Sequence, residues 1–240
     1  MFQSNFLNGP HAAPASQGPA RQIVVLLHGY GADGDDLIAL APLLAEALPD
    51  AAFHAPHAPD PCEGAPFGRQ WFSLEGYDPN MLRRDPERMG GIHELMLTGA
   101  RSVSGAVDGY LDDLLSHYNL PESALALVGF SQGTMMALHV APRRTEKMAA
   151  VLGYSGALLG AGSLQGEARQ FPPIHLIHGA ADDVVPVEAM GTAVTALTAA
   201  GFSVESHTRP GLAHGIDPAG AAVGLQFLRR HLAPEASAGS

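Results

Sequence analysis

Four short, mainly apolar runs are the feature that most constrains how this chain of 240 residues can fold. Each is followed by a glycine within a few residues, and they lie at residues 23–27, 125–128, 149–152 and 174–177. Apolar runs of this length, bounded by glycine, are typical of strands that are buried on both faces of a parallel sheet. Residues 51–54 and 203–208 predict two further strands.

Helical patterns separate the predicted strands. In residues 101–118, apolar side chains recur every three or four positions and therefore share one helix face. Similar patterns cover residues 36–48, 134–144, 187–200 and 220–232. Strands that alternate with helices of this length predict an α/β fold, in which a mostly parallel central sheet carries helices on both faces.

We predict a single domain over residues 21–233, because no linker and no internal repeat divides the alternating pattern. Residues 1–20 are rich in Pro, Gly, Ala and Ser, so we expect a loosely ordered N-terminal segment. By the same reasoning, residues 234–240 are expected to form a flexible tail.

Residues 59–99 depart from the alternation. They are rich in proline, glycine and charge, and they contain Trp71, the single tryptophan of the chain. Long loops inside a compact domain are usually functional or disordered, and the aromatic residues here favour an ordered one. We therefore expect a loop insertion near the functional site. A surface loop that buries one aromatic anchor is the alternative.

Charge and targeting signals exclude several classes of function. The formal net charge is −11, from 24 acidic and 13 basic residues, and such a balance repels nucleic acids and anionic membrane surfaces. Cys62 is the single cysteine, so nothing in the chain requires an oxidising compartment. The first twenty residues lack the features of a secretory signal, and no apolar stretch approaches the length of a membrane span. We expect a cytoplasmic protein without a membrane span.

The pentapeptide at residues 129–133, Gly-Phe-Ser-Gln-Gly, is the strongest chemical motif. Because it lies directly between a predicted strand and a predicted helix, Ser131 is expected in a tight turn, with Oγ at the carboxyl edge of the sheet. A Cβ at either flanking glycine would collide with the neighbouring strand or helix. The N–H of Gln132 lies at a helix N-terminus, where positive partial charge favours an oxyanion. A glycine-rich turn with a solvated serine is the alternative.

A serine nucleophile needs a histidine base and an orienting carboxylate, which in this type of fold follow it in the order acid, then histidine. Asp182 and Asp183 follow the strand predicted at 174–177, and His214 follows the strand predicted at 203–208. Both positions lie at the carboxyl ends of strands, where open α/β sheets have their active sites. Adjacent side chains point in different directions, so only one of the two aspartates can reach the histidine.

The remaining histidines are expected to pack in the core or lie on the surface. His178 is the exception, because it precedes the loop that carries the acid and can hydrogen-bond to it. Neither a His-Glu-x-x-His motif nor a cluster of cysteines is present, so we expect no metal site. The turn at residues 28–36 lacks the lysine of a phosphate-binding loop and carries three aspartates, which argues against a nucleotide site.

Four sequence blocks, taken in order, resemble the phospholipase/carboxylesterase family, the branch of the α/β-hydrolases that includes bacterial carboxylesterases and acyl-protein thioesterases. The blocks are residues 28–44 (HGYGADGDDLIALAPLL), 129–138 (GFSQGTMMAL), 178–186 (HGAADDVVP) and 211–216 (GLAHGI). They lie across nearly the whole chain and are together far more specific than the serine motif alone. The resemblance implies the α/β-hydrolase fold.

The same resemblance implies a role for each of five residues. Ser131 is the implied nucleophile, Asp182 the orienting acid and His214 the base. The backbone N–H groups of Tyr30 and Gln132 are the implied oxyanion hole.

Residues 69–72 resemble the family segment whose aromatic residue flanks the acyl pocket, so Trp71 and Phe72 are expected to bind substrate. Two features differ from the eukaryotic thioesterases of the family: Tyr30 stands where these usually carry leucine, and the loop after Trp71 is unlike theirs. Both departures weigh against a protein-deacylating role.

The sequence thus predicts a serine hydrolase that cleaves carboxylic esters of small to medium acyl chains through an acyl-enzyme, without a cofactor. Its expected partner is a small-molecule ester, and a homodimer is compatible with this prediction. A lysophospholipase or an acyl-protein thioesterase is the alternative, because both use the same residues. A hydrolase-fold scaffold that binds a ligand without catalysis is the alternative of a different class.

Overall fold

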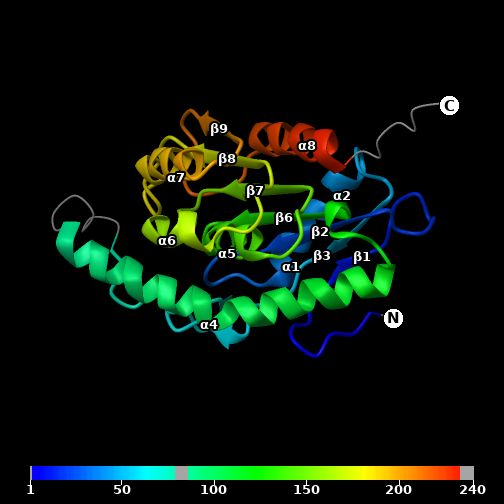
Figure 1. Ribbon diagram of the computed structural model, residues 1–240, viewed down its shortest axis with the longest axis horizontal. Helices are drawn as coiled ribbons and strands as arrows, with labels where there is room; N and C mark the ends of the chain where they lie inside the picture. Colours follow the sequence, from blue (N-terminus) through cyan, green and yellow to red (C-terminus); the bar gives the residue numbers. More distant parts are fainter. Residues whose placement is uncertain (1, 79–85, 233–240) are drawn as a thin grey trace.

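The computed structural model describes residues 2–78 and 86–232, and a seven-stranded sheet forms the centre of the fold (Figure 1). The strand order is β1-β3-β2-β6-β7-β8-β9, with β1 antiparallel to β3 and every other pair parallel. The strands are β1 (His11–Ala12), β2 (Gln22–Leu27), β3 (Ala51–His54), β6 (Leu125–Phe130), β7 (Ala150–Tyr154), β8 (Ile174–Gly179) and β9 (Val204–Arg209). All six predicted strands are confirmed, and β1 is an addition.

Helices cover both faces of this sheet, as predicted. They are α1 (Gly34–Leu37), α2 (Ala41–Ala45), α4 (Pro86–Tyr118), α5 (Gln132–Val140), α6 (Ala161–Glu167), α7 (Glu188–Ala199) and α8 (Pro218–Leu232). Side chains of β2 alternate between the faces: Ile23, Val25 and Leu27 pack in the core cluster of α4, α5 and α7, whereas Val24 and Leu26 pack in that of α1, α2 and α8. In Figure 1, α4 and α8 accordingly lie on opposite sides of the sheet.

Two predicted helices are shorter than expected because proline interrupts them. The segment predicted at 36–48 divides into α1, a 3₁₀ turn at Ile38–Leu40 and α2, with Pro42 in the first turn of α2. The segment predicted at 134–144 ends as α5 at Val140 and continues as a 3₁₀ turn that contains Pro142. Proline lacks the N–H that a helix interior needs, and its ring disfavours helical geometry at the preceding residue.

The prediction of a loop insertion over residues 59–99 is wrong for its last part, because helix α4 already begins at Pro86. Ile92, Met96 and Leu97 continue the buried face of that helix. Glycines at 90, 91 and 99 obscured this period in the sequence. The first part of the region carries a two-stranded hairpin of β4 (Asp60–Pro61) and β5 (Arg69–Gln70).

The first twenty residues are held against the sheet, unlike the loosely ordered segment that we expected. β1 pairs with β3, the Leu7 side chain is buried, and the backbone N–H of Ser16 donates to Pro49 O at 2.9 Å. An edge strand of a sheet offers unpaired backbone N–H and C=O groups to a neighbouring segment, and the amino-acid composition of that segment does not reveal this pairing. The predicted tail at 234–240 lies outside the described residues. Within the described ranges, no helix combines the length and the apolar character that crossing a membrane requires.

The N-terminus of α5 packs unusually close to the carboxyl end of β2. A Cβ added at Gly133 would collide with the carbonyl oxygen of Leu27 and would lie 2.7 Å from that of His28. A Cβ at Gly129 would collide with the backbone N of Thr134. Both glycines of the serine motif are therefore needed for the approach of helix to sheet, as predicted.

Replacing Gly133 by alanine tests this close approach. Gly133→Ala is expected to lower the free energy of unfolding by at least about 2 kcal/mol, because backbone atoms must move apart to admit the methyl group. The matched control is Gly105→Ala in α4, where no atom lies within 4 Å of the added Cβ and a gain of roughly 0.5–1 kcal/mol is expected. Urea unfolding measures both. Equal effects of the two substitutions would contradict the packing argument.

Candidate active site

Ser131 occupies the turn between β6, which ends at Phe130, and α5, which begins at Gln132. Its backbone has φ 52° and ψ −114°, a conformation that residues other than glycine rarely adopt. The turn is held in place because the N–H of Ser131 donates to Tyr154 O (2.8 Å), while its carbonyl accepts from the N–H groups of Thr134 and Met135. A strained serine at this point is the geometry of a nucleophile elbow.

Asp182 lies in the loop after β8, and its side chain has no exposed surface. Oδ1 accepts hydrogen bonds from the N–H groups of Val184 (3.0 Å) and Val185 (2.8 Å). Oδ2 accepts from Nδ1 of His214 at 2.8 Å. Asp183, in contrast, is exposed. The structure thus selects Asp182 as the aspartate that contacts the histidine.

His214 lies in the loop after β9, and this loop packs on the one that carries Asp182. The N–H of Ala181 donates to Leu212 O at 2.9 Å, and a Cβ at Gly179 would collide with that same carbonyl oxygen. The imidazole of His214 also lies 4.9 Å, between ring centroids, from the ring of Phe130, the residue before Ser131. Three neighbouring loops therefore bring serine, aspartate and histidine to one edge of the sheet.

Two opposing effects act on the pKa of Asp182. Burial is the larger single effect and raises it, because a carboxylate loses solvation in the interior. Hydrogen bonds from His178, from His214 and from the N–H of Val185 together outweigh burial and lower the pKa well below its usual value. The side chain is therefore held as a carboxylate over the whole neutral range.

Two backbone N–H groups near Ser131 are free. Within residues 2–78 and 86–232, the N–H groups of Gly31 and Ser131 have backbone acceptors, whereas those of Tyr30 and Gln132 have none. The loop that carries Tyr30 approaches the serine closely, since a Cβ at Gly29 would lie 3.4 Å from the Cβ of Ser131. The predicted pair of donors therefore comes from adjacent backbone segments.

Trp71 and Phe72 are placed differently from the prediction that they bind substrate. Trp71 is 0% exposed and Phe72 is 3% exposed, so their rings contact protein. The N–H of Trp71 donates to Oε1 of Gln132 (2.9 Å), and Nε2 of Gln132 donates to Phe72 O (2.7 Å). The indole Nε1 of Trp71 donates to His28 O at 2.9 Å. These residues instead join the Gln132 turn to the loop after β2.

His28 is a supporting residue that sequence reasoning missed. Its Nε2 accepts from the N–H of Ala58 (3.0 Å), so Nδ1 carries the proton that is donated to Gly29 O (2.8 Å). Burial lowers the pKa of this imidazole, which favours the neutral ring. Its position directly after an apolar strand was the one available signal.

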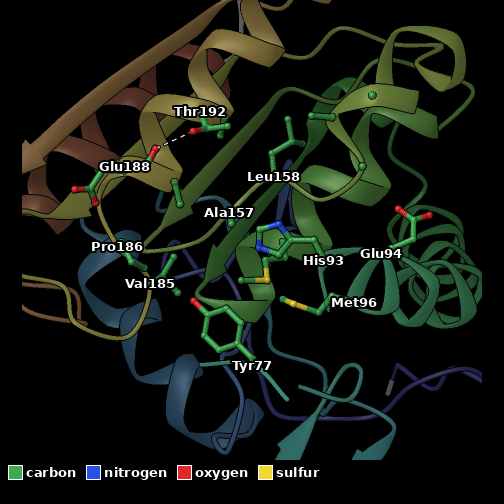
Figure 2. A pocket seen from close by; sticks show the side chains of 16 residues that line it. Tyr77, His93, Glu94, Met96, Ala157, Leu158, Val185, Pro186, Glu188 and Thr192 are labelled. Carbon is green, nitrogen blue, oxygen red and sulfur yellow. Dashed lines mark hydrogen bonds between the residues drawn. The ribbon is translucent and has the colours of Figure 1, made fainter. Parts of the chain in front are cut away.

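A cavity of about 610 Å³ opens beside these loops, and Figure 2 shows its lining. Met135, one helical turn after Ser131, lines it, as does Val185 of the Asp182 loop. Most of the lining is apolar, and Tyr77, Met96 and Leu158 project toward the same space (Figure 2). Neither Trp71 nor Phe72 contributes to it. The cavity has the character of a binding site for an apolar group.

One group of potential metal ligands occurs in the described part of the chain: Asp33, Asp35 and His57. Asp33 Oδ1 already accepts from the N–H groups at the start of α1, and His57 Nδ1 accepts from the N–H of Gly34 at 3.1 Å. These atoms therefore serve as helix caps.

The phospholipase/carboxylesterase family model matches residues 10–233. Esterase YpfH of Escherichia coli (strain K12) is 30% identical over 230 residues, which cover 92% of this chain and 89% of that protein. Acyl-protein thioesterase 1 of Saccharomyces cerevisiae (strain ATCC 204508 / S288c) is 29% identical over 195 residues, which cover 75% and 78% of the two chains.

Among solved structures, esterase PE8 is similar with a TM-score of 0.85 and 39% identity, covering 94% of this chain and 99% of that one. The fold and the edge-of-sheet site define an α/β-hydrolase. The chain belongs to the phospholipase/carboxylesterase family. The predicted family, fold and class of enzyme, a carboxylesterase of the serine-hydrolase type, are confirmed.

The lowered pKa of Asp182 predicts how stability depends on pH. A carboxylate whose pKa is lower in the folded state stabilises the protein above its unfolded pKa, and this contribution is lost as the pH falls. Between pH 5 and pH 3, the free energy of unfolding should therefore fall more steeply for the wild type than for Asp182→Asn. The difference in slope is at most about 1.4 kcal/mol per pH unit, the value for one proton.

Urea unfolding at several pH values measures these slopes. Asp183→Asn is the matched control, because its side chain is exposed and should leave the slope of the wild type unchanged. Parallel curves for the wild type and Asp182→Asn would contradict the assigned hydrogen bonding.

Proposed function

We propose that the protein hydrolyses carboxylic esters of small to medium acyl chains through an acyl-enzyme formed on Ser131. The observation that carries this proposal is the 2.8 Å hydrogen bond between His214 Nδ1 and a buried Asp182 carboxylate, formed at the sheet edge where Ser131 has its strained turn. A carboxylate held ionised beside an imidazole is the arrangement that activates a serine hydroxyl.

In the first step, His214 is the general base. In the neutral imidazole whose Nδ1–H donates to Asp182, Nε2 is the unprotonated nitrogen and can take the proton of Ser131 Oγ as this oxygen attacks the ester carbonyl. The resulting tetrahedral oxyanion would receive hydrogen bonds from the free N–H groups of Tyr30 and Gln132. Protonated His214 then gives its proton to the leaving alcohol, and the acyl-enzyme remains.

In the second step, a water molecule takes the place of the alcohol. His214 removes a proton from this water as it attacks the acyl carbonyl, and the same N–H groups stabilise the second oxyanion. Collapse of the intermediate returns the proton to Ser131 Oγ and releases the carboxylic acid. All of these groups belong to the protein, and no step uses a cofactor.

The cavity beside the catalytic loops is the proposed site for the acyl group. Its volume of about 610 Å³ and its apolar side chains suit a short or medium hydrocarbon chain. Met135 and Val185 connect it to the nucleophile turn and to the acid loop. In this proposal, residues of α4, α5 and α7 contact the substrate, whereas Trp71 and Phe72 do not.

The acyl-protein thioesterases among the relatives support a second candidate, thioester hydrolysis, which would use the same residues. A lysophospholipase remains a third, with the same chemistry. Tyr30, at the position where eukaryotic thioesterases usually carry leucine, favours the ester hydrolase. The cytoplasmic location and the homodimer stay predictions from the sequence.

Ser131→Ala tests the nucleophile. Ester hydrolysis should be lost, because removal of the nucleophile from such a triad costs about 10⁶-fold in kcat, whereas the thermal midpoint should stay near that of the wild type. The assay measures kcat on a short-chain ester and labelling by a fluorophosphonate probe. Retention of more than about a tenth of wild-type kcat would refute the assignment, and a folded wild type that does not label would favour the scaffold alternative.

Asp182→Asn and Asp183→Asn form a matched pair that tests the acid. Loss of the carboxylate leaves the imidazolium unsupported and lets His214 adopt the wrong tautomer, so Asp182→Asn should lower kcat by at least about 10²-fold. Asp183→Asn, whose side chain is exposed, should lower kcat by less than about tenfold. Circular dichroism confirms that both variants are folded. If Asp183→Asn is the impaired variant, the assignment of the acid is wrong.

A further inference from the structure

We propose that His178 is a positioning residue for the catalytic acid: it binds the same carboxylate oxygen of Asp182 that binds His214, and thereby sets how strongly Asp182 holds the base. This inference rests on the proposed function and adds a second histidine to the site. His178 does not itself line the cavity, and its polar contacts are with the carbonyl oxygen of Val185 and the carboxylate of Asp182, so its effect on the reaction is indirect.

The hydrogen bonds of His178 determine which of its nitrogens carries a proton. The side chain is 1% exposed and lies near the end of β8. Its Nε2 lies 2.7 Å from the carbonyl oxygen of Val185 and 3.3 Å from Oδ2 of Asp182. A carbonyl oxygen can only accept a hydrogen bond, so Nε2 is protonated and its N–H donates to Val185 O, with Oδ2 of Asp182 as a second, longer contact of the same N–H.

Asp182 Oδ2 is therefore shared between two imidazoles. His214 Nδ1 donates to it at 2.8 Å, and His178 Nε2 approaches at 3.3 Å, while Oδ1 is occupied by two backbone N–H groups of residues 184 and 185. Each donor to a carboxylate stabilises the anion and makes it a weaker acceptor for the others. The bond from His178 is thus in direct competition with the bond from His214.

Other titratable groups face this loop from a different segment. Tyr77 donates its hydroxyl to Val184 O at 2.9 Å, and burial, followed by the charge of Asp182, raises its pKa to about 12. It therefore stays neutral across the range in which the enzyme would be assayed. Asp78, the neighbour of Tyr77, acts on the same phenol through its charge. His178 and His214 are then the imidazoles that contact the acid directly.

Loss of the His178 bond has a defined kinetic consequence. A carboxylate with one donor fewer is more basic and stabilises the protonated form of His214 more strongly. The acid limb of the pH profile of kcat/KM, which reports the base in the free enzyme, should then move to higher pH. If His178 had a purely structural role, its replacement would lower the thermal midpoint and would leave the acid limb of the pH profile unchanged.

Three variants of His178 test the proposal. His178→Leu removes the donor, and His178→Asn places its amide one bond too short to reach Oδ2. His178→Gln carries its Nε2 the same number of bonds from Cα as the imidazole Nε2, so it should restore the donor. His175→Leu is the matched control, because His175 is also buried in β8 but packs against Phe227, away from Asp182.

The measurement is kcat/KM and kcat on one short-chain ester from pH 5 to pH 9, with the thermal midpoint of each variant. His178→Leu and His178→Asn should move the acid limb up by at least about 0.5 pH unit. His178→Gln should stay within about 0.2 pH unit of the wild type. His175→Leu should change the thermal midpoint alone.

Two outcomes would overturn the proposal. One is a loss of activity in His178→Asn, or in His178→Leu, with the acid limb unmoved, since this would reveal a structural role only. The other is a Gln variant that behaves like the Asn variant, since a restored donor would then have no effect. Failure of the proposed function itself would be seen separately, as wild-type protein that is not labelled at Ser131 by the fluorophosphonate probe.

Discussion

The approach of the first turn of α5 to the carboxyl end of β2 is the packing constraint on which the site depends. Gly133 lies against the carbonyl oxygens of Leu27 and His28, which leaves no room for a Cβ. The close approach of α5 to β2 makes the turn between β6 and α5 so tight that Ser131 adopts φ 52°. It also brings the loop after β2 beside the serine, since a Cβ at Gly29 would lie 3.4 Å from the Cβ of Ser131. Strain and proximity are consequences of the same contact.

A second set of contacts ties distant segments to that turn. The Gln132 side chain is 0% exposed and bonds to the backbone of Trp71 and Phe72, while the indole of Trp71 bonds to His28 O. On the other side, Asp182 holds His214 and receives two backbone N–H groups of its own loop. The buried side chains of Gln132, Trp71 and Asp182 thus each have a hydrogen-bond partner from another loop, which holds the site in place before any substrate arrives.

Predictions from sequence succeeded where burial imposes a pattern. β2, β6, β7 and β8 are covered on both faces, so their apolar runs identify them directly. The sequence was misleading where the pattern is diluted. Glycines interrupt the helical period in the first turns of α4, and the composition of the N-terminal segment is that of an unordered chain although β1 pairs with β3. Pairing at a sheet edge depends on a neighbour that the local sequence does not contain.

The sequence by itself determined the class of fold, the serine turn and the order of the serine, the aspartate and the histidine along the chain, because each follows from local patterning at strand ends. Tertiary structure alone decided which of two adjacent aspartates meets the histidine, since this depends on how the loops after β8 and β9 pack on each other. It also decided that Trp71 is buried support and that His178 shares the carboxylate with His214. Such facts depend on the directions of side chains that meet only when separate loops pack together, as those of Asp182 and His214 do across 32 residues of sequence, and no one-dimensional pattern encodes them.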